Sequence, residues 1–314
     1  MILVVALNPA LDVTHHVAGV DWAGTNRPAV VQTRPGGKGL NVARTLRALG
    51  EQVRVTGLAG GAAGEEVAAG LAAAGVAAAF TPIGGQTRRT FAVVDTERNG
   101  AALFNEPGPA VEPADYARFL VRYEKELNGS RAAVLSGSLP PGLGPDIYAE
   151  LTARAAAAGV PVVLDAHGEA LARGAAAGPA IVKPNLAELA GLAGQQLSAG
   201  GRTDHEAVAA AAAELRAAGA QAVVVSLGAE GLWAVTAEGR WHAAPPGPVA
   251  GNPIGAGDAV AAGLARGLVA GWPWEERLRH AVALGTAVAA APVAGEFSRT
   301  AYEALLGAVT VGAR

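Results

Sequence analysis

A segment near the carboxyl end of the chain combines two glycines with a carboxylate, directly before a run of small residues. It reads NPIGAGD over residues 252–258, and the following AVAAGLARGL predicts a helix that begins near this point. The first amides of a helix have no partner within it, and the helix dipole favours negative charge there. Gly255, Ala256 and Gly257 would then form an anion site. Asp258 would lie in the same turn, where it suits a general base beside a phosphoryl group.

A second glycine-rich segment, PGGKGLN at residues 35–41, precedes another predicted helix. Its glycines allow a ligand to approach the backbone closely, and Lys38 offers a positive charge for an anion. The segment is not a Walker A loop, because Lys38 is followed by Gly39 instead of Ser or Thr. GAGDAV is not a dinucleotide-binding fingerprint either, since its sixth residue is Val260. Each segment alone also fits an ordinary loop before a helix. Because both occur in one chain, we favour a role for them in binding an anion.

The elements that would position these segments alternate along the chain. From about residue 130, the apolar runs RAAVLSGS, VPVVLDA, PAIVKPN and AQAVVVSLG predict buried strands with alanine-rich helices between them. An earlier unit has predicted strands at 2–7 and 52–58 and predicted helices near 38–50 and 64–74. This alternation predicts a mostly parallel sheet with helices on both faces. Ligands of such sheets lie beyond the carboxyl ends of the strands.

Two regions, residues 12–34 and 87–106, break this alternation. They read as short strands with one polar face, and Asn99-Gly100 is a hairpin turn signal. We expect them to pair as a small antiparallel sheet that forms a lid. The predicted main domain then comprises residues 1–11, 35–86 and 107–314.

Composition narrows the class of protein. A chain of 314 residues can bury the core of one large α/β domain, and its formal net charge of −3 supplies no basic field for nucleic acid or an anionic membrane. It has no cysteine, which excludes disulfides and cysteine nucleophiles. The start, MILVVALNPALD, reads as a strand and not as a signal peptide, and no apolar run is long enough to span a membrane. We therefore expect a cytoplasmic protein.

The two glycine-rich segments resemble the paired signatures of the ribokinase-like (PfkB) carbohydrate kinases. The branch of 1-phosphofructokinase and tagatose-6-phosphate kinase is the most similar, through LNPALD, TNR, GGKGLNVAR, TRRT, SGSLPPGL, VKPNLAEL, SLGAEG and NPIGAGD in this order. The resemblance implies a three-layer α/β/α fold with a mostly parallel central sheet and a small antiparallel β lid. It also implies ATP-dependent phosphorylation of a ketohexose monophosphate. Fructose 1-phosphate, which would give fructose 1,6-bisphosphate, is favoured over tagatose 6-phosphate.

The resemblance also assigns roles to residues by position. Asp258 matches the catalytic base, and the three residues before it match an anion hole. Asp12 and Asn41 match groups that hold sugar hydroxyls, a task that needs both acceptors and donors. Asp12 could instead be an ordinary polar residue at a strand end. Further substrate contacts are expected from Gly36, Gly37 and Ser138.

Three cations are predicted to hold a phosphate that is already on the sugar: Arg27, Lys38 and Arg88. A kinase for neutral sugars does not need three cations at its acceptor site, whereas a sugar phosphate does. Arg89 could take the place of Arg88, because strand alternation sends only one of the two inward.

Nucleotide and metal sites are implied in the segments VKPNLAEL and SLGAEG. Lys183, Asn185, Ser226 and Gly228 match nucleotide-binding positions. Asn185 and Glu188 are expected to hold Mg²⁺ through water, because this ion keeps much of its hydration shell. The same two residues could also cap a helix. Asn252 stands where many family members have Asp, which leaves dependence on a monovalent cation open.

Two other function classes remain possible from the sequence. One is a neutral-sugar or nucleoside kinase of the same fold, against which the predicted cations argue. The other is a non-catalytic sugar-phosphate sensor, which would not need Asp258 as a base. A homodimer joined through the lids is also expected, because a sheet with one apolar face leaves that face partly uncovered. No spacing among His15, His16 and His167 indicates a metal site.

Overall fold

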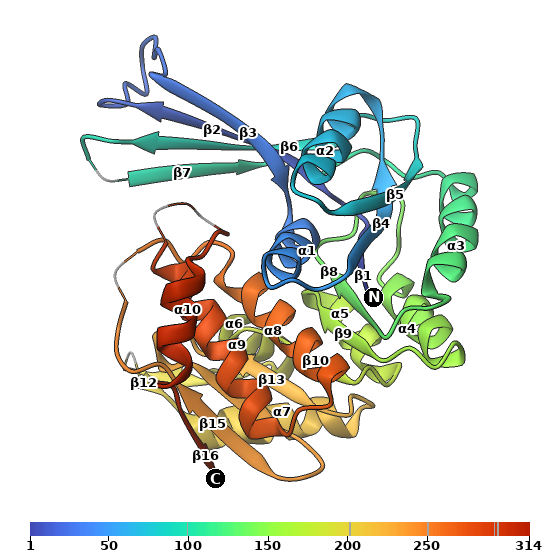
Figure 1. Ribbon diagram of the computed structural model, residues 1–314, viewed down its shortest axis with the longest axis vertical. Coiled ribbons are helices and arrows are strands. Elements are labelled where there is room, and N and C mark those ends of the chain that lie inside the picture. Colours follow the sequence, from blue (N-terminus) through green and yellow to red (C-terminus); the bar gives the residue numbers. More distant parts are fainter. Residues whose placement is uncertain (99, 201, 250, 292, 294) are drawn as a thin grey trace.

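The computed structural model describes residues 1–314 except 99, 201, 250, 292 and 294. Among these residues, ten strands form one large sheet (Figure 1). The strands from β13 to β5 run parallel, while β14, β15 and β16 extend one edge as an antiparallel meander. Their order across the sheet is β16 (Thr310–Ala313), β15 (Arg240–Ala244), β14 (Leu232–Val235), β13 (Val223–Ser226), β10 (Ile181–Val182), β9 (Val162–Asp165), β8 (Ala132–Ser136), β1 (Ile2–Ala6), β4 (Val53–Ala59) and β5 (Ala77–Pro82).

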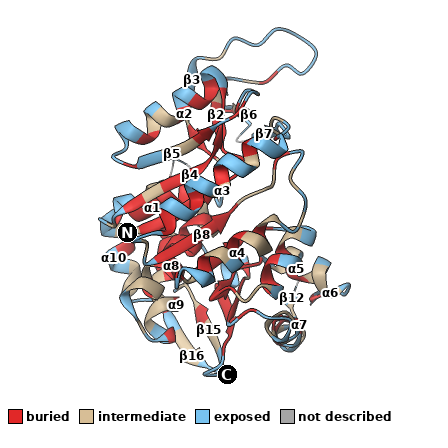
Figure 2. Cartoon of the chain, turned by 90° about the vertical axis from the view of Figure 1, so that its right-hand side faces the viewer, coloured by how far each residue is buried: buried red, intermediate tan, exposed pale blue. Residues whose placement is uncertain are grey.

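Helices cover both faces of this sheet, so the central strands are buried on both sides (Figure 2). In β1, Ile2 and Val4 face one core while Leu3 and Val5 face the other, because successive side chains of a strand point to opposite faces. One layer holds α1 (Lys38–Ala48), α2 (Gly61–Ala73), α8 (Ala256–Ala270), α9 (Trp274–Ala289) and α10 (Arg299–Leu306). The other layer holds α3 (Pro113–Leu127), α4 (Ile147–Ala157), α5 (Gly168–Ala176), α6 (Leu186–Ala193) and α7 (His205–Ala217). The predicted three-layer α/β/α fold is therefore correct.

Four further strands form a separate sheet that projects from one end of the main body (Figure 1). We call this sheet the lid; its order is β3 (Val30–Gly36), β2 (Ala10–Val17), β6 (Arg88–Asp95) and β7 (Gly100–Asn105). Its two hairpins are antiparallel, as expected. The central β2–β6 pair is parallel, because both strands leave the main body in the same direction. The predicted Asn99-Gly100 turn includes Asn99, which lies outside the described residues.

Short connections complete the fold around the carboxyl edge of the large sheet. A two-stranded ribbon, β11 (Ser198–Ala199) and β12 (Arg202–Thr203), lies between α6 and α7, and a 3₁₀ turn, η1 (Gly228–Glu230), joins β13 to β14. No helix within the described residues has both the length and the apolar character to cross a membrane.

Candidate active site

The predicted base and anion site lie at the amino end of α8. Gly255 caps this helix with a φ of +87°, a backbone conformation that favours glycine, and a Cβ on it would lie 2.8 Å from the Cα of Gly295. The first bond of the helical ladder runs from the Ala259 amide to the Gly255 carbonyl, at 2.9 Å. No partner for the amides of Gly257 and Asp258 lies among the described residues. These two amides can therefore donate to an anion.

Asp258 is buried, with 6% of its surface exposed, and it lines a cavity of about 1070 Å³. Burial, and secondly the negative charge of Asp165, raises the pKa of Asp258 from 3.8 to about 7, against the opposing effects of Asn41 and two lysines. The Asn41 amide donates a hydrogen bond of 2.9 Å to the carboxylate. A carboxyl group with a pKa near neutrality can accept a proton at physiological pH, which is what a general base requires.

Asp165 links the two lysines of the site. It ends β9 and is fully buried. Its Oδ1 lies 3.2 Å from Lys38 Nζ, and its Oδ2 lies 3.4 Å from Lys183 Nζ. Lys183 is itself only 3% exposed. The sequence analysis did not identify Asp165 as a site residue, although its place at the carboxyl end of a buried strand was a usable signal.

Lys38 is held by more than one carboxylate. Its ammonium also lies 3.6 Å from Glu188 Oε1. Burial alone would lower the pKa of Lys38, but Asp165, Glu188 and Asp258 outweigh it and raise this pKa above its usual value. Its positive charge is therefore balanced within the protein. This differs from the expected arrangement, in which Lys38 would be available to balance a substrate phosphate.

Asp12 lies on the side of the lid that faces the large cavity. A Cβ on Gly36 of β3 would lie within 2.1 Å of the Asp12 carboxylate, so a larger residue there would displace this carboxylate. Burial raises the pKa of Asp12, while Arg34, Arg88 and Arg44 oppose this rise. Asp12 is therefore surrounded by cations, as a group that holds a polar ligand would be. Arg34 and Arg44 were not among the predicted site residues.

Arg27 lies away from Lys38 and Arg88. It is exposed in the loop between β2 and β3, and it lines neither the large cavity nor a smaller cavity beside it. β2 continues to Val17 and β3 begins only at Val30, so this loop lies at the far end of the lid. The structure does not bring Arg27 together with Lys38 and Arg88 within one chain.

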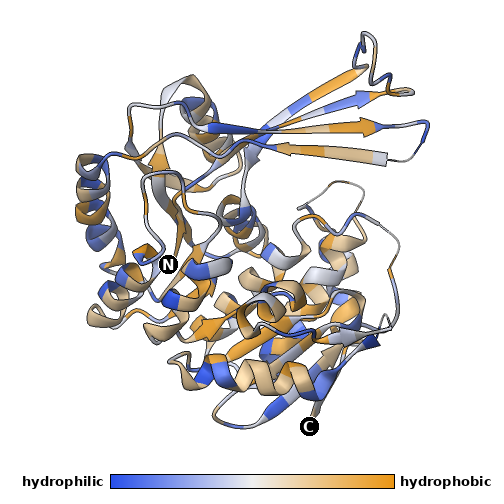
Figure 3. Cartoon of the chain, turned by 180° about the vertical axis from the view of Figure 1, so that it is seen from behind, coloured by the Kyte–Doolittle hydropathy of each residue, from blue (hydrophilic) through white to orange (hydrophobic). Residues whose placement is uncertain are grey.

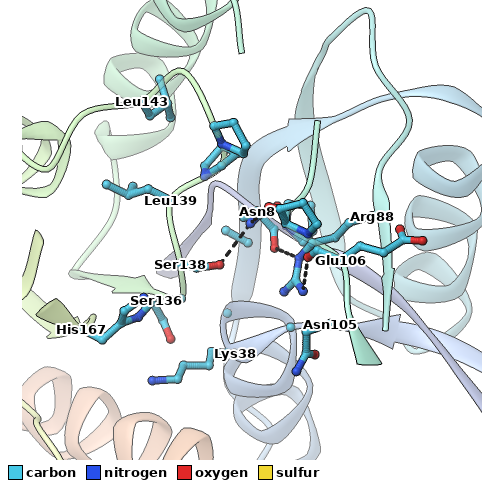
Figure 4. A pocket seen from close by; sticks show the side chains of 18 residues that line it. Asn8, Lys38, Arg88, Asn105, Glu106, Ser136, Ser138, Leu139, Leu143 and His167 are labelled. Carbon is cyan, nitrogen blue, oxygen red and sulfur yellow. Dashed lines mark hydrogen bonds between the residues drawn. The ribbon is translucent and has the colours of Figure 1, made fainter. Parts of the chain in front are cut away.

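A second cavity, of about 610 Å³ (Figure 4), adjoins the first and shares Gly37, Lys38, Arg88 and Asn105 with it. We call it the acceptor pocket. Gly37 has a φ of +90° at the start of α1, which favours glycine there. Ser138 accepts a hydrogen bond of 3.1 Å from the Asn8 amide, and Asn8 also donates to the Pro107 carbonyl at 3.0 Å. Asn8 is a lining residue that the sequence analysis missed.

Asn185 and Glu188 form a capping box at the start of α6. Asn185 Oδ1 accepts from the Glu188 amide at 2.8 Å, and Glu188 Oε2 accepts from the Asn185 amide at 2.9 Å. Both side chains thus supply oxygens, the ligand type that Mg²⁺ prefers. Because these oxygens already accept helix amides, contact with the ion through water fits the arrangement better than direct ligation.

The remaining part of the large cavity has an apolar wall beside a polar edge. Ser226 and Gly228 line it next to Asn185, and an isolated bridge joins the backbones of Asn185 and Ser226. Such a mixture suits a nucleotide base and its ribose. The apolar lining residues are Leu232, Val249, Ile254, Val260, Val282, Ala289 and Val293.

The histidines considered as metal ligands, His15, His16 and His167, lie apart from one another. His15 lies on the lid near Phe91, with ring centroids 6.5 Å apart, while His16 lines the large cavity and His167 lines the acceptor pocket. Within the described residues, no group of three or more His, Asp or Glu side chains is arranged to hold a metal ion.

Comparisons with known proteins agree with this geometry. The model of the pfkB family of carbohydrate kinases matches residues 6–301. Phosphofructokinase-2 from Escherichia coli in complex with potassium is 29% identical, with 98% of each chain covered and a TM-score of 0.90. The same enzyme in complex with fructose-6-phosphate has a TM-score of 0.86 at 29% identity and the same coverage. A possible 1-phosphofructokinase from Thermotoga maritima is 28% identical, covering 100% of this chain and 99% of the other, with a TM-score of 0.85.

Proposed function

Because this chain belongs to the pfkB family of carbohydrate kinases, we propose that it phosphorylates a ketohexose monophosphate with ATP and uses Asp258 as the general base. The observation that carries this proposal is the buried Asp258, whose pKa is raised to about 7, beside the unpartnered amides of α8. These groups face a cavity that continues into the acceptor pocket, where Arg88 lies.

The reaction follows from the position of these groups. Asp258 takes the proton of the acceptor hydroxyl, the oxygen forms a bond to the γ-phosphorus of ATP, and the bond to ADP breaks. The amides of Gly257 and Asp258 stabilise the charge on the transferring group. Lys183 lines the same cavity, where Asp165 holds its ammonium at 3.4 Å. Positioning and charge stabilisation supply most of what phosphoryl transfer needs from a protein.

The substrate is the part of the proposal that needs a direct test. We propose fructose 1-phosphate as the acceptor, with tagatose 6-phosphate as the alternative, and the complex of the Escherichia coli neighbour makes fructose 6-phosphate a necessary comparison. An ADP-coupled assay over these three sugar phosphates and their free sugars decides between them. The highest kcat/KM on a sugar phosphate is expected. Activity on free sugars alone would instead identify a neutral-sugar kinase.

Magnesium would be held beside the nucleotide phosphates by Asn185 and Glu188 through water. When bound, the ion would neutralise charge on the phosphates. We predict that Glu188→Gln raises the Mg²⁺ concentration needed for half-maximal rate by about 10-fold or more, because loss of a residue around a metal site weakens metal affinity by about that factor. The measurement is a Mg²⁺ titration of the rate at saturating sugar phosphate and ATP.

A control variant tests whether the loss of any negative charge at the start of a helix changes the Mg²⁺ requirement. Glu206→Gln changes another carboxylate in the first turn of a helix, α7, where the side chain is 84% exposed. Its Mg²⁺ requirement should equal that of the wild type. If Glu188→Gln lowers the melting temperature but leaves the Mg²⁺ titration unchanged, Glu188 serves only as a cap.

The lid offers a surface for a homodimer. Large apolar side chains on it are about half exposed, and Figure 3 shows apolar stretches along its strands. We propose that two copies associate through their lids. Sedimentation should give the dimer mass, and Phe104→Asp should give a monomer, because a charge buried in an apolar interface costs several kcal/mol. A wild-type protein that sediments only as a monomer would refute this proposal. Val31 and Phe104 lie on one face of the lid, whereas Val30 and Leu103 lie on the other face, where Leu103 lines the large cavity.

A further inference from the structure

Arg88 in the acceptor pocket has hydrogen-bond partners but no ion-pair partner among the described residues. Arg88 Nε donates to the Asn8 carbonyl at 3.1 Å, and Arg88 Nη1 lies 3.4 Å from the Glu106 carbonyl. No carboxylate of the described residues lies within ion-pair distance of this guanidinium. The nearby Glu106 carboxylate accepts from the Arg89 amide at 2.7 Å instead. Main-chain carbonyls therefore hold Arg88 in position, while Asp12 and Glu106 act on its charge only from beyond ion-pair distance.

The wall that faces Arg88 across the pocket holds further polar groups (Figure 4). Ser136 ends β8 and is 2% exposed, and its hydroxyl has no hydrogen-bond partner in the described part of the chain. His167 occupies the cap position of α5, a helix of nine residues, but its ring does not cap the helix. The Ser136 hydroxyl, which has no partner among the described residues, and the His167 imidazole can both donate a hydrogen bond to an anion in this pocket.

We propose that the phosphate of the acceptor sugar binds in this pocket between Arg88 and His167, so that His167 completes the clamp that Lys38 was expected to complete. This inference rests on the proposed sugar-phosphate kinase activity and adds a specificity-determining residue to it. Lys38 is already balanced by Asp165 and Glu188, whereas the imidazole offers a ring N–H to a phosphate oxygen. A free sugar has no anion for these groups, so His167 contributes to the preference for phosphorylated acceptors.

The test compares His167→Ala with the wild type on the best sugar phosphate of the panel. We expect KM for the sugar phosphate to rise about 10- to 100-fold, the effect of losing one hydrogen bond to a charged group. KM for ATP and the rate on the corresponding free sugar should stay within about twofold. Calorimetry on the nucleotide-free protein, with inorganic phosphate as the probe, should show weaker binding by a similar factor.

The control is Glu169→Gln, which alters an exposed carboxylate in the first turn of the same helix. It should leave KM for the sugar phosphate unchanged. A rise in KM in this control would show that any disturbance of α5 weakens binding. If the wild type prefers sugar phosphates but His167→Ala keeps its KM for them, the inference about His167 is wrong and the proposed function stands. If the wild type phosphorylates only free sugars, the proposed function itself is wrong and this inference fails with it.

Discussion

Asp258→Asn is expected to lower kcat by a factor of about 10² to 10⁴, the usual contribution of a general base. The dissociation constants of both substrates should change by less than about threefold. Asparagine has almost the same shape and can still accept the hydrogen bond from Asn41, but it cannot take the proton of the sugar hydroxyl. The measurements are single-substrate kinetics and calorimetric titration of each substrate. Turnover close to that of the wild type would exclude Asp258 as the base.

The raised pKa of Asp258 also sets how the rate and the stability of the protein should depend on pH. Below pH about 7 the wild-type carboxyl becomes protonated, so its rate should fall with falling pH. In the unfolded chain the pKa of this group is near 3.8, so between these values the folded state binds more protons than the unfolded state. The contribution of Asp258 to stability is therefore lost as pH rises through this window. Asp258→Asn should melt at a higher temperature than the wild type at pH 8, and the difference should shrink toward pH 4.

An exposed carboxylate supplies the control for this comparison. Glu206→Gln removes a charge of the same sign where no burial opposes it, since 84% of the Glu206 side chain is exposed. It should change neither kcat nor the difference in melting temperature between pH 4 and pH 8. If Asp258→Asn behaves in the same way, its carboxyl group is not held near neutrality by burial.

The fold was predictable because it depends on local patterns. Apolar strands and alanine-rich helices alternate repeatedly along the chain. This alternation predicts a mostly parallel sheet with a layer of helices on each face. The helices predicted near 38–50 and 64–74 are α1 and α2, within a few residues. The parallel β2–β6 pair was not predictable in the same way. Its direction depends on where two distant hairpins leave the main body, and no local signal encodes this.

The charges of the site were less predictable than its motifs. Counting cations in the sequence suggested that Arg27, Lys38 and Arg88 act together. In the structure, Lys38 forms an ion pair with Asp165, which is 127 residues away in the chain, and this contact balances the charge of the lysine. Arg27 and Arg88 look alike in sequence, but only Arg88 lines the cavities. The availability of a charge depends on its neighbours in space, which one sequence does not show.

Asp165→Asn is the second replacement with a large expected effect. It leaves Lys183 buried without its carboxylate, and breaking a buried ion pair in this way costs about 3–5 kcal/mol of stability. It also releases Lys38 from its closest partner, so both lysines lose their fixed positions in the site. We expect kcat to fall by at least about 10-fold, since a group misplaced by about 1 Å can cost as much as 10² in rate. Steady-state kinetics and thermal unfolding measure the two effects.

The pH profile distinguishes a role in catalysis from a purely structural one. After burial, the charge of Asp165 is the largest cause that raises the pKa of Asp258, and the lysines that lower this pKa remain in the variant. The acid limb of the rate profile of Asp165→Asn should therefore move to lower pH than in the wild type. Glu188→Gln is the matched control, because it also removes a carboxylate from Lys38, yet Glu188 is not among the groups that shift the pKa of Asp258. An acid limb that stays in place in Asp165→Asn would mean that the Asp258 carboxyl does not set this limb, even if the variant is less stable and slower.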